Sequence, residues 1–167
     1  INKGPAFVPL GFESDDKTLL VATNAGRDTM AVYRYDPEAK KLGELIAQHP
    51  RYDIGADGLG SRVAGIVREP ETDRVLGYSV NAAKPEVVWL DPQYAAKQAA
   101  LDKHFAGKTN TFRRAPDGKR WVVTSYSDTS PVRWYMYDEA NKTIEEIGAS
   151  KPWLDGKLVE QRPFTFK

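Results

Sequence analysis

The stretch KRWVVTSYSDTSPVRWYMYD at residues 119–138 decides the fold, because the same pattern occurs three times in the chain. A run rich in β-forming residues comes first, a polar loop comes next, and a second β-rich run ends in Asp. The other two copies read KTLLVATNAGRDTMAVYRYD at residues 17–36 and DRVLGYSVNAAKPEVVWLD at residues 73–91. The closing aspartates are separated by 55 residues (36 to 91) and by 47 residues (91 to 138). Because blades of β-propellers repeat at about 40–50 residues, the pattern predicts propeller blades.

Further strands flank each copy. The turn before the third copy, Pro116-Asp117-Gly118, is favourable because Pro fixes its own φ and Gly accepts a positive φ. The flanking strands are expected at residues 8–12, 62–67 and 109–113 before the copies, and at residues 42–47 and 143–147 after the first and third. The sequence therefore predicts an all-β fold, a β-propeller fragment of about three four-stranded antiparallel blades. The blades are expected at about residues 5–50, 60–107 and 108–150.

The second copy is succeeded by a helical pattern. Asp91 suits the N-cap, Pro92 suits the first helical position, and Gly107 suits the position just past the end. Apolar residues at helical spacing between these ends are Tyr94, Leu101 and Phe105. We therefore expect one helix inserted after the second blade. It lengthens the first period and packs on the outer rim.

Composition narrows the range of partners. Lys plus Arg is 24 and Asp plus Glu is 23, so the net charge of +1 provides no field that would hold nucleic acid or an anionic membrane. The chain has no cysteine, which excludes disulfides and thiolate zinc sites. No apolar stretch approaches the length of a membrane span. We expect neither nucleic acid nor membrane as a partner.

No catalytic residue is predicted in the chain. The nucleophile elbow Gly-x-Ser-x-Gly of α/β-hydrolases is missing from the sequence, and so is a phosphate-binding loop. His49 and His104 are the two histidines, and both are interpreted as exposed or capping residues. Asp53 and Asp57 lack the spacing of a calcium loop and are interpreted as turn residues. We therefore expect no metal and no cofactor.

Four arginines are the candidate binding residues. They flank or end the expected first strands of the second and third blades: Arg62, Arg68, Arg113 and Arg114. The first strand of a propeller blade lines the central channel, where a guanidinium can bind a carboxylate or carbonyl of a peptide. The alternative is that these arginines pair with neighbouring acids on the rim. The aromatic residues of the strands are interpreted as core and inter-blade packing.

Several short strings occur together in a way that resembles one family. They are VWLDPQY at 88–94, QAALD at 98–102, SDTSP at 127–131, YMYD at 135–138 and KPWL at 151–154. As a set, they resemble the propeller domain of the prolyl oligopeptidase family of serine peptidases, in its dipeptidyl aminopeptidase and acylaminoacyl peptidase branch. Residues 151–167 resemble the exit strand that leads toward an α/β-hydrolase domain absent from this chain.

The resemblance implies a non-catalytic, substrate-gating and substrate-selecting part of a peptidase that acts on peptides. The Ser, Asp and His of the family lie in its hydrolase domain, so we expect the chain alone to be inactive. The resemblance also suggests a periplasmic or secreted protein. Because three blades cannot close a ring, we expect the open blade faces to self-associate.

Two alternatives to the gating function stay open. One is a non-enzymatic propeller that serves as a binding or scaffold module, which further blades and no hydrolase in the flanking sequence would favour. The other is a self-contained enzyme on an all-β scaffold, which hydrolysis of a peptide by the purified chain would favour.

Overall fold

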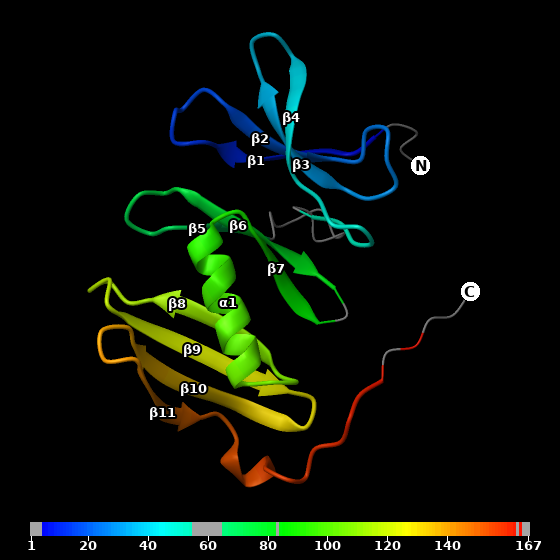
Figure 1. The fold of residues 1–167 in the computed structure, drawn as a ribbon. Helices are drawn as coiled ribbons and strands as arrows, with labels where there is room; N and C mark the ends of the chain where they lie inside the picture. Colours follow the sequence, from blue (N-terminus) through cyan, green and yellow to red (C-terminus); the bar gives the residue numbers. More distant parts are fainter. Residues whose placement is uncertain (1–4, 55–64, 83, 163, 165–167) are drawn as a thin grey trace. The chain divides into compact units, whose positions relative to one another are not determined.

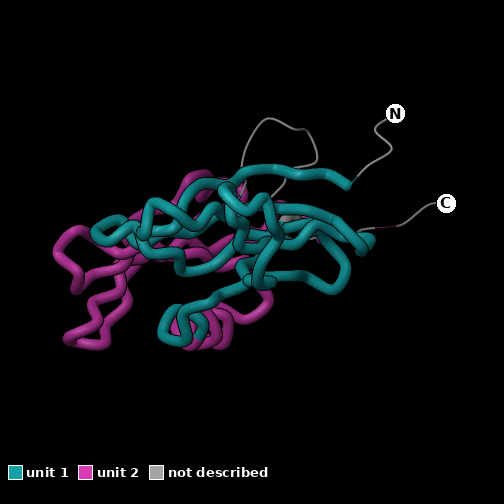
Figure 2. The backbone as a smooth tube through the Cα atoms, turned by 90° about the horizontal axis from the view of Figure 1, so that it is seen from above, with its two compact units in different colours: residues 1–95 teal, residues 96–167 magenta. Residues whose placement is uncertain are grey.

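The computed structural model describes residues 5–54, 65–82, 84–162 and 164. The chain divides into two compact units, residues 1–95 and 96–167, which are coloured separately in Figure 2. The described residues form three antiparallel sheets and one α-helix (Figure 1). None of the helices in this part of the chain has the length and apolarity needed to cross a membrane.

Sheet 1 has four strands arranged in sequence order. They are β1 (Phe7–Phe12), β2 (Leu19–Thr23), β3 (Ala31–Asp36) and β4 (Lys41–Ala47). The turns after β1 and β3 each contain a residue with positive φ, Asp16 at 55° and Lys40 at 52°, whereas the longer loop of residues 24–30 joins β2 to β3. The two β-rich runs and both flanking strands predicted for the first copy are confirmed.

Sheet 2 has three strands in the described residues. They are β5 (Ile66–Arg68), β6 (Val75–Asn81) and β7 (Pro85–Trp89). The expected first strand began at residue 62, and its start lies outside the described residues. The helix α1 (Pro92–His104) stands where the other sheets have a fourth strand. The expectation of an inserted helix is confirmed, and within the described residues this sheet has three strands rather than the expected four.

The core of the first unit lies between sheets 1 and 2. Its buried side chains are Leu20, Val32, Ala47, Ile54, Tyr78 and Val80. Tyr78 and Val80 are two residues apart on β6, so both side chains project from the same face of sheet 2. Burial of such side chains stabilises each by about 1.5–3 kcal/mol.

Sheet 3 is four-stranded and lies in the second unit. It consists of β8 (Thr109–Arg114), β9 (Arg120–Ser127), β10 (Ser130–Asp138) and β11 (Thr143–Ala149), in the order of the sequence. The later turns of α1 pack on one face of this sheet, since Phe105 just past the helix stacks 4.6 Å from Tyr135. The predicted strands of the third copy are confirmed.

Residues 151–162 differ from the expected exit strand. Pro152–Leu154 form the 3-10 turn η1, and residues 155–162 have no strand assignment. A strand needs a neighbouring strand to satisfy its backbone groups, and among the described residues this segment has no ladder partner. The structure shows a mostly β protein with three antiparallel sheets and one helix. Their arrangement as blades of a propeller stays a prediction.

Candidate functional site: the polar network of the hairpin turns

The three aspartates that close the repeats share one local geometry. Asp36 Oδ1 accepts hydrogen bonds from the backbone N–H groups of the residues two and three positions later. Asp138 Oδ1 does the same with Ala140 and Asn141. Such turns satisfy backbone donors that a strand leaves open at its end. The aspartate that closes the first and third copies therefore forms the same turn in both.

In the second copy this turn has become the start of a helix. Asp91 Oδ1 accepts from the N–H groups of Gln93 and Tyr94, at 2.8 and 3.1 Å, which is the geometry of an N-cap. Asp91 is buried, and its other oxygen accepts from Arg74 Nη1 at 2.7 Å. The hydrogen bond from Arg74 lowers the pKa of Asp91. The helix thus begins on a carboxylate that is tied to the turn before β6.

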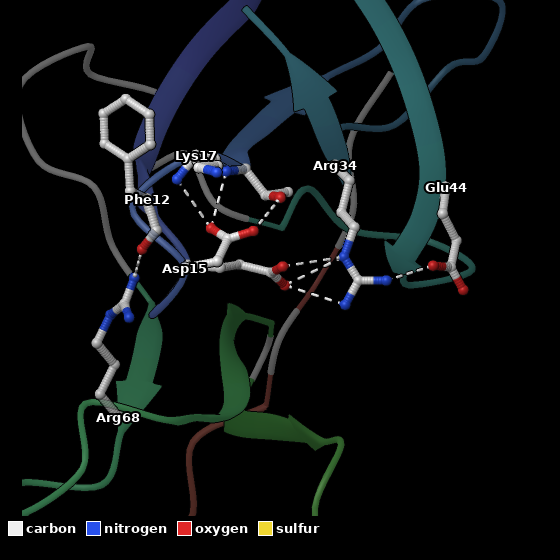
Figure 3. A network of polar contacts seen from close by, with 8 residues as sticks. Phe12, Asp15, Lys17, Arg34, Glu44 and Arg68 are labelled. Atoms are coloured by element: carbon white, nitrogen blue, oxygen red, sulfur yellow. Dashed lines mark hydrogen bonds and ion pairs between the residues drawn. The ribbon is translucent and has the colours of Figure 1, made fainter.

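Arg34 on β3 joins two strands of sheet 1 (Figure 3). Its Nε and Nη2 donate to the carboxylate of Glu13 at 3.1–3.2 Å, and its Nη1 pairs with Glu44 on β4. The hydrogen bond from Arg34 to Glu13 is the main reason that the pKa of Arg34 is raised. A planar guanidinium shared between two carboxylates ties β3 to the residue after β1 and to the middle of β4.

Arg68 at the end of β5 links two turns of the first unit (Figure 3). Its Nη2 donates to the carbonyl of Phe12 at 3.0 Å, and its Nη1 donates to the carbonyl and carboxylate of Asp73 at 2.9 and 3.1 Å. Asp73 is the residue of its turn with a positive φ, 56°. Arg68 therefore connects sheet 2 to the end of β1.

The other three arginines predicted as binding residues have different positions. Arg114 at the end of β8 donates from Nε and Nη2 to the carbonyl of Gly118, also a residue with positive φ. Arg113 is exposed and forms no hydrogen bond or ion pair with the residues that the structure describes. Arg62 lies outside the described residues. Arg68 lies in the first unit and Arg113 and Arg114 lie in the second, and peptide binding by them stays a prediction.

A cavity of about 320 Å³ opens beside this network in the first unit. Its polar lining is mostly charged and already paired: Glu13, Asp15, Arg34, Asp73 and Arg74. Tyr78 lies at its apolar side with a fully buried side chain. Its hydroxyl has no hydrogen-bond partner within the described part of the chain, and burial raises the pKa of Tyr78 to about 12.

Lys97 on α1 occupies an aromatic pocket in the second unit. Its Nζ lies 4.2 Å from the ring centre of Trp121 and 5.2 Å from that of Tyr137. The same Nζ is 2.8 Å from Glu139 Oε1, and the other oxygen of Glu139 accepts from Trp121 Nε1 at 3.0 Å. These hydrogen bonds, that from Lys97 first, lower the pKa of Glu139. This contact docks the helix on sheet 3.

The two histidines are predicted to be exposed or capping residues, and His49 caps a turn while His104 is exposed. His49 Nδ1 accepts from the N–H groups of Arg51 and Tyr52, and its Nε2 lies 2.9 Å from Glu86. His104 is exposed in the last turn of α1. Asp53 accepts from the N–H of Met30 at 2.6 Å, whereas Asp57 lies outside the described residues. Among the residues described, no three His, Cys, Asp or Glu side chains are grouped so as to hold a metal ion.

The sequence did not predict that Arg34, Arg74 and Lys97 would form the ion pairs described above. A signal existed for Arg74, because it stands immediately before the β-rich run that ends in the helix-capping Asp91. No comparable signal existed for Lys97, whose partners Trp121 and Glu139 are distant in sequence.

These features define a mostly β protein of repeated antiparallel sheets in which charged side chains tie turns, strand ends and one helix together. Over 156 residues, 93% of the chain, it is 30% identical to dipeptidyl aminopeptidase BIII of Pseudoxanthomonas mexicana. The chain spans 21% of the length of that protein. The similarity supports a relationship to a peptidase family. No family model matches the chain, and no solved structure matches it significantly.

Proposed function

We propose that this chain is a non-catalytic, substrate-gating and substrate-selecting portion of a serine peptidase of the prolyl oligopeptidase family that acts on peptides. The observation that carries the proposal is the similarity to a dipeptidyl aminopeptidase along 93% of the chain. That stretch corresponds to 21% of the relative, so the chain contributes one part of a larger architecture.

The polar network formed by Arg34, Arg68 and their partners gives this proposal a physical basis. A gate has to keep its shape while peptides pass, and the network holds the hairpin ends of the sheets by charge-assisted hydrogen bonds. Arg68 joins the turn of sheet 2 to the carbonyl of Phe12, and Arg34 joins Glu13 to Glu44. Phe12 and Arg68 end their strands and Glu13 follows β1, so a loose turn there would change the opening that a substrate meets.

Arg113 is the best candidate among the described arginines for contact with a peptide. It lies on the edge strand β8, it is exposed, and it forms no ion pair with any residue that the structure describes. Arg68, in contrast, already donates to two backbone carbonyls and a carboxylate. An exposed guanidinium binds a peptide carboxylate or carbonyl at little desolvation cost.

The test uses the polypeptide encoded by the whole reading frame that contains residues 1–167. Its hydrolysis of a dipeptidyl nitroanilide is compared with its cleavage of a folded protein. We expect the dipeptide derivative to be cleaved and the folded protein to be refused. Loosening the network by Arg68→Ala should raise cleavage of the large substrate with little change for the small one. A polypeptide that hydrolyses neither substrate would favour the binding or scaffold alternative.

Arg113 has its own test in the same polypeptide. Arg113→Ala should raise KM for longer peptides and leave kcat for the dipeptide derivative unchanged, while Arg113→Lys should restore part of the loss. Arg162→Ala is the matched control, because Arg162 is 84% exposed and lies outside the three sheets. Equal effects of both alanine variants would refute a specific contact at Arg113.

A further inference from the structure

The cavity of about 320 Å³ described above is lined by residues of the first unit. Sheet 1 provides the turn after β1, Arg34 on β3 and Ile46 on β4. Sheet 2 provides Asp73 and Arg74 in the turn before β6, and Tyr78 on β6 itself. Because ligand pockets in proteins usually measure about 300–1,000 Å³, a cavity of this size suits a small molecule.

Tyr78 brings a buried hydroxyl to this cavity. Its side chain is fully buried, and the hydroxyl has no hydrogen-bond partner among the described residues. Burial is the main reason that the pKa of Tyr78 is raised, and the nearby charges of Glu13, Arg68 and Arg34 also act on it. The hydroxyl therefore lies toward the charged side of the cavity. Proteins rarely leave a buried hydroxyl unpaired, so a bound molecule that accepts its hydrogen bond is favoured.

Two arginines of the lining retain donors for a ligand. Arg34 uses Nε and one N–H of each terminal nitrogen on Glu13 and Glu44, and its other N–H groups form no hydrogen bond with a described residue. Arg74 engages two carboxylates through Nη1 and Nε, and its Nη2 forms no hydrogen bond with any residue that the structure describes. A guanidinium matches the geometry of a carboxylate, so this side of the cavity suits a carboxylate group.

Glu13 is the acceptor of the lining that suits a cation. Its oxygens accept from Arg34 at 3.1–3.2 Å, and a carboxylate oxygen has room for a further hydrogen bond. Its side chain is 25% exposed. Asp15, in contrast, already accepts from three donors of its own turn, and Asp73 is paired with Arg68. An ammonium group in the cavity would therefore bind at Glu13.

The rest of the cavity wall is aliphatic. Ile46 and Val75 are half-buried, and Leu90 is 42% exposed. Such side chains are stabilised by contact with an apolar group that removes them from water. The cavity thus combines donors for a carboxylate, an acceptor for an ammonium group and an aliphatic wall. An α-amino acid with an aliphatic side chain carries all three complementary groups.

We propose that this cavity binds a small zwitterion, namely an aliphatic α-amino acid, either free or as a dipeptide. Its carboxylate accepts hydrogen bonds from the Tyr78 hydroxyl and the two guanidiniums, and its ammonium group donates to Glu13. Its side chain contacts the aliphatic wall. A ligand held in this way joins the turns of sheets 1 and 2, so its binding stabilises the folded state. The inference goes beyond the gating function and does not depend on it.

The test measures binding by calorimetry and by the shift in melting temperature. It uses the polypeptide encoded by the whole reading frame that contains residues 1–167. Leucine and leucyl-leucine are the probes, binding of either one supports the proposal, and their affinities distinguish the two sources. The N-acetyl form of the probe lacks the ammonium group and the amide form lacks the carboxylate, so each should bind about tenfold more weakly. Equal affinity of either modified form would overturn the proposal.

Two variants locate the probe in this cavity. Tyr78→Phe removes only the unpaired hydroxyl, so the fold should keep its stability while affinity for the probe falls about tenfold. Tyr126→Phe is the matched control, because Tyr126 is half-buried on β9 and does not line the cavity, and it should bind like the unaltered polypeptide. Glu13→Gln should weaken binding of the probe and leave binding of its N-acetyl form unchanged. A general loosening of the fold would weaken both.

Two further results would contradict the proposal. If neither leucine nor leucyl-leucine binds the unaltered polypeptide, the cavity does not hold a zwitterion and the proposal is overturned. If Tyr78→Phe binds the probe with full affinity, the probe lies elsewhere and the proposal is also overturned. Peptide hydrolysis is measured separately, so failure of this proposal and failure of the peptidase proposal are distinguishable.

Discussion

Arg74 Nη1 lies 2.7 Å from Asp91 Oδ2, and the other oxygen of Asp91 caps α1. One carboxylate therefore joins the turn before β6 to the start of the helix. In sheets 1 and 3 the equivalent aspartates, Asp36 and Asp138, close a strand-to-strand turn instead. The same residue type in the same repeat position thus begins either a hairpin or a helix, depending on the residues after it.

Replacing Asp91 should destabilise the chain more than replacing Asp36. Asp91→Ala removes an N-cap and leaves the guanidinium of Arg74 with Glu69 as its remaining ion-pair partner, so we expect a loss of about 1–2 kcal/mol in the free energy of unfolding. Asp36 is exposed, and Asp36→Ala should cost less. Denaturant unfolding of both variants provides the measurement. Equal losses would contradict a special role for Asp91.

The hairpin turns should make the fold sensitive to acid. Hydrogen bonds, led by those from the Thr18 hydroxyl to Asp15 and from the Lys119 N–H to Asp117, lower both pKa values from 3.8 to about 2. A lowered pKa means that the folded state holds the proton less tightly than the unfolded state. The associated stability is present above about pH 4 and is lost as the pH falls toward 2.

Asp15→Asn and Asp117→Asn, combined in one variant, test whether these two carboxylates cause the loss of stability in acid. An amide keeps an acceptor oxygen for the turn but does not titrate, so the melting temperature of the double variant should fall less steeply between pH 4 and pH 2. Asp16→Asn serves as control, because Asp16 lies in the same turn as Asp15 and its carboxylate forms no hydrogen bond with a described residue. A double variant with the acid profile of the unaltered chain would refute this origin.

Tyr78 should tolerate loss of its hydroxyl but not of its ring. The hydroxyl is buried without a hydrogen-bond partner among the described residues, so Tyr78→Phe should leave stability unchanged or raise it by about 1 kcal/mol. Tyr78→Ala opens a cavity in the core between sheets 1 and 2 and should cost about 3–5 kcal/mol. Thermal and denaturant unfolding measure both. A clear loss of stability in Tyr78→Phe would show that the hydroxyl has a partner.

Tyr78 should also make the stability of the fold depend on pH in the alkaline range. Burial raises the pKa of Tyr78 from 10 to about 12, so the folded state disfavours the phenolate. The stability that this provides is present below pH 10 and is lost as the pH rises toward 12. Tyr78→Phe should lessen this loss in a melting profile taken from pH 8 to pH 12, whereas an unchanged profile would contradict the assignment.

Lys97 should contribute more to the stability of the fold than an exposed lysine of the same helix. Its side chain is 16% exposed, pairs with Glu139 and lies over Trp121. Lys97→Met should lower stability by about 1 kcal/mol and change the fluorescence of Trp121. Lys103→Met is the control, since Lys103 is an exposed residue in the last turn of the same helix. Similar effects of both variants would refute the docking role.

The sequence predicted local structure well because local chemistry determines it. Pro116-Asp117-Gly118 forms the expected turn with Gly118 at φ 68°, and Gly107 ends the helix at φ 77°. The roles of Arg68 and Lys97 were not predictable in this way. Their partners Phe12 and Glu139 are distant in sequence, and only the packing of sheet 2 on sheet 1 and of α1 on sheet 3 brings each pair together.

The central claim is that these residues belong to a serine peptidase without forming its catalytic centre. The most direct measurement labels the native protein in its source cells with a fluorophosphonate that reacts with active-site serines. An antibody against residues 109–149 then identifies the polypeptide. We predict that the labelled polypeptide contains these residues and is larger than 18.7 kDa. Labelling of the 167-residue chain itself, or of no polypeptide that contains it, would contradict the account.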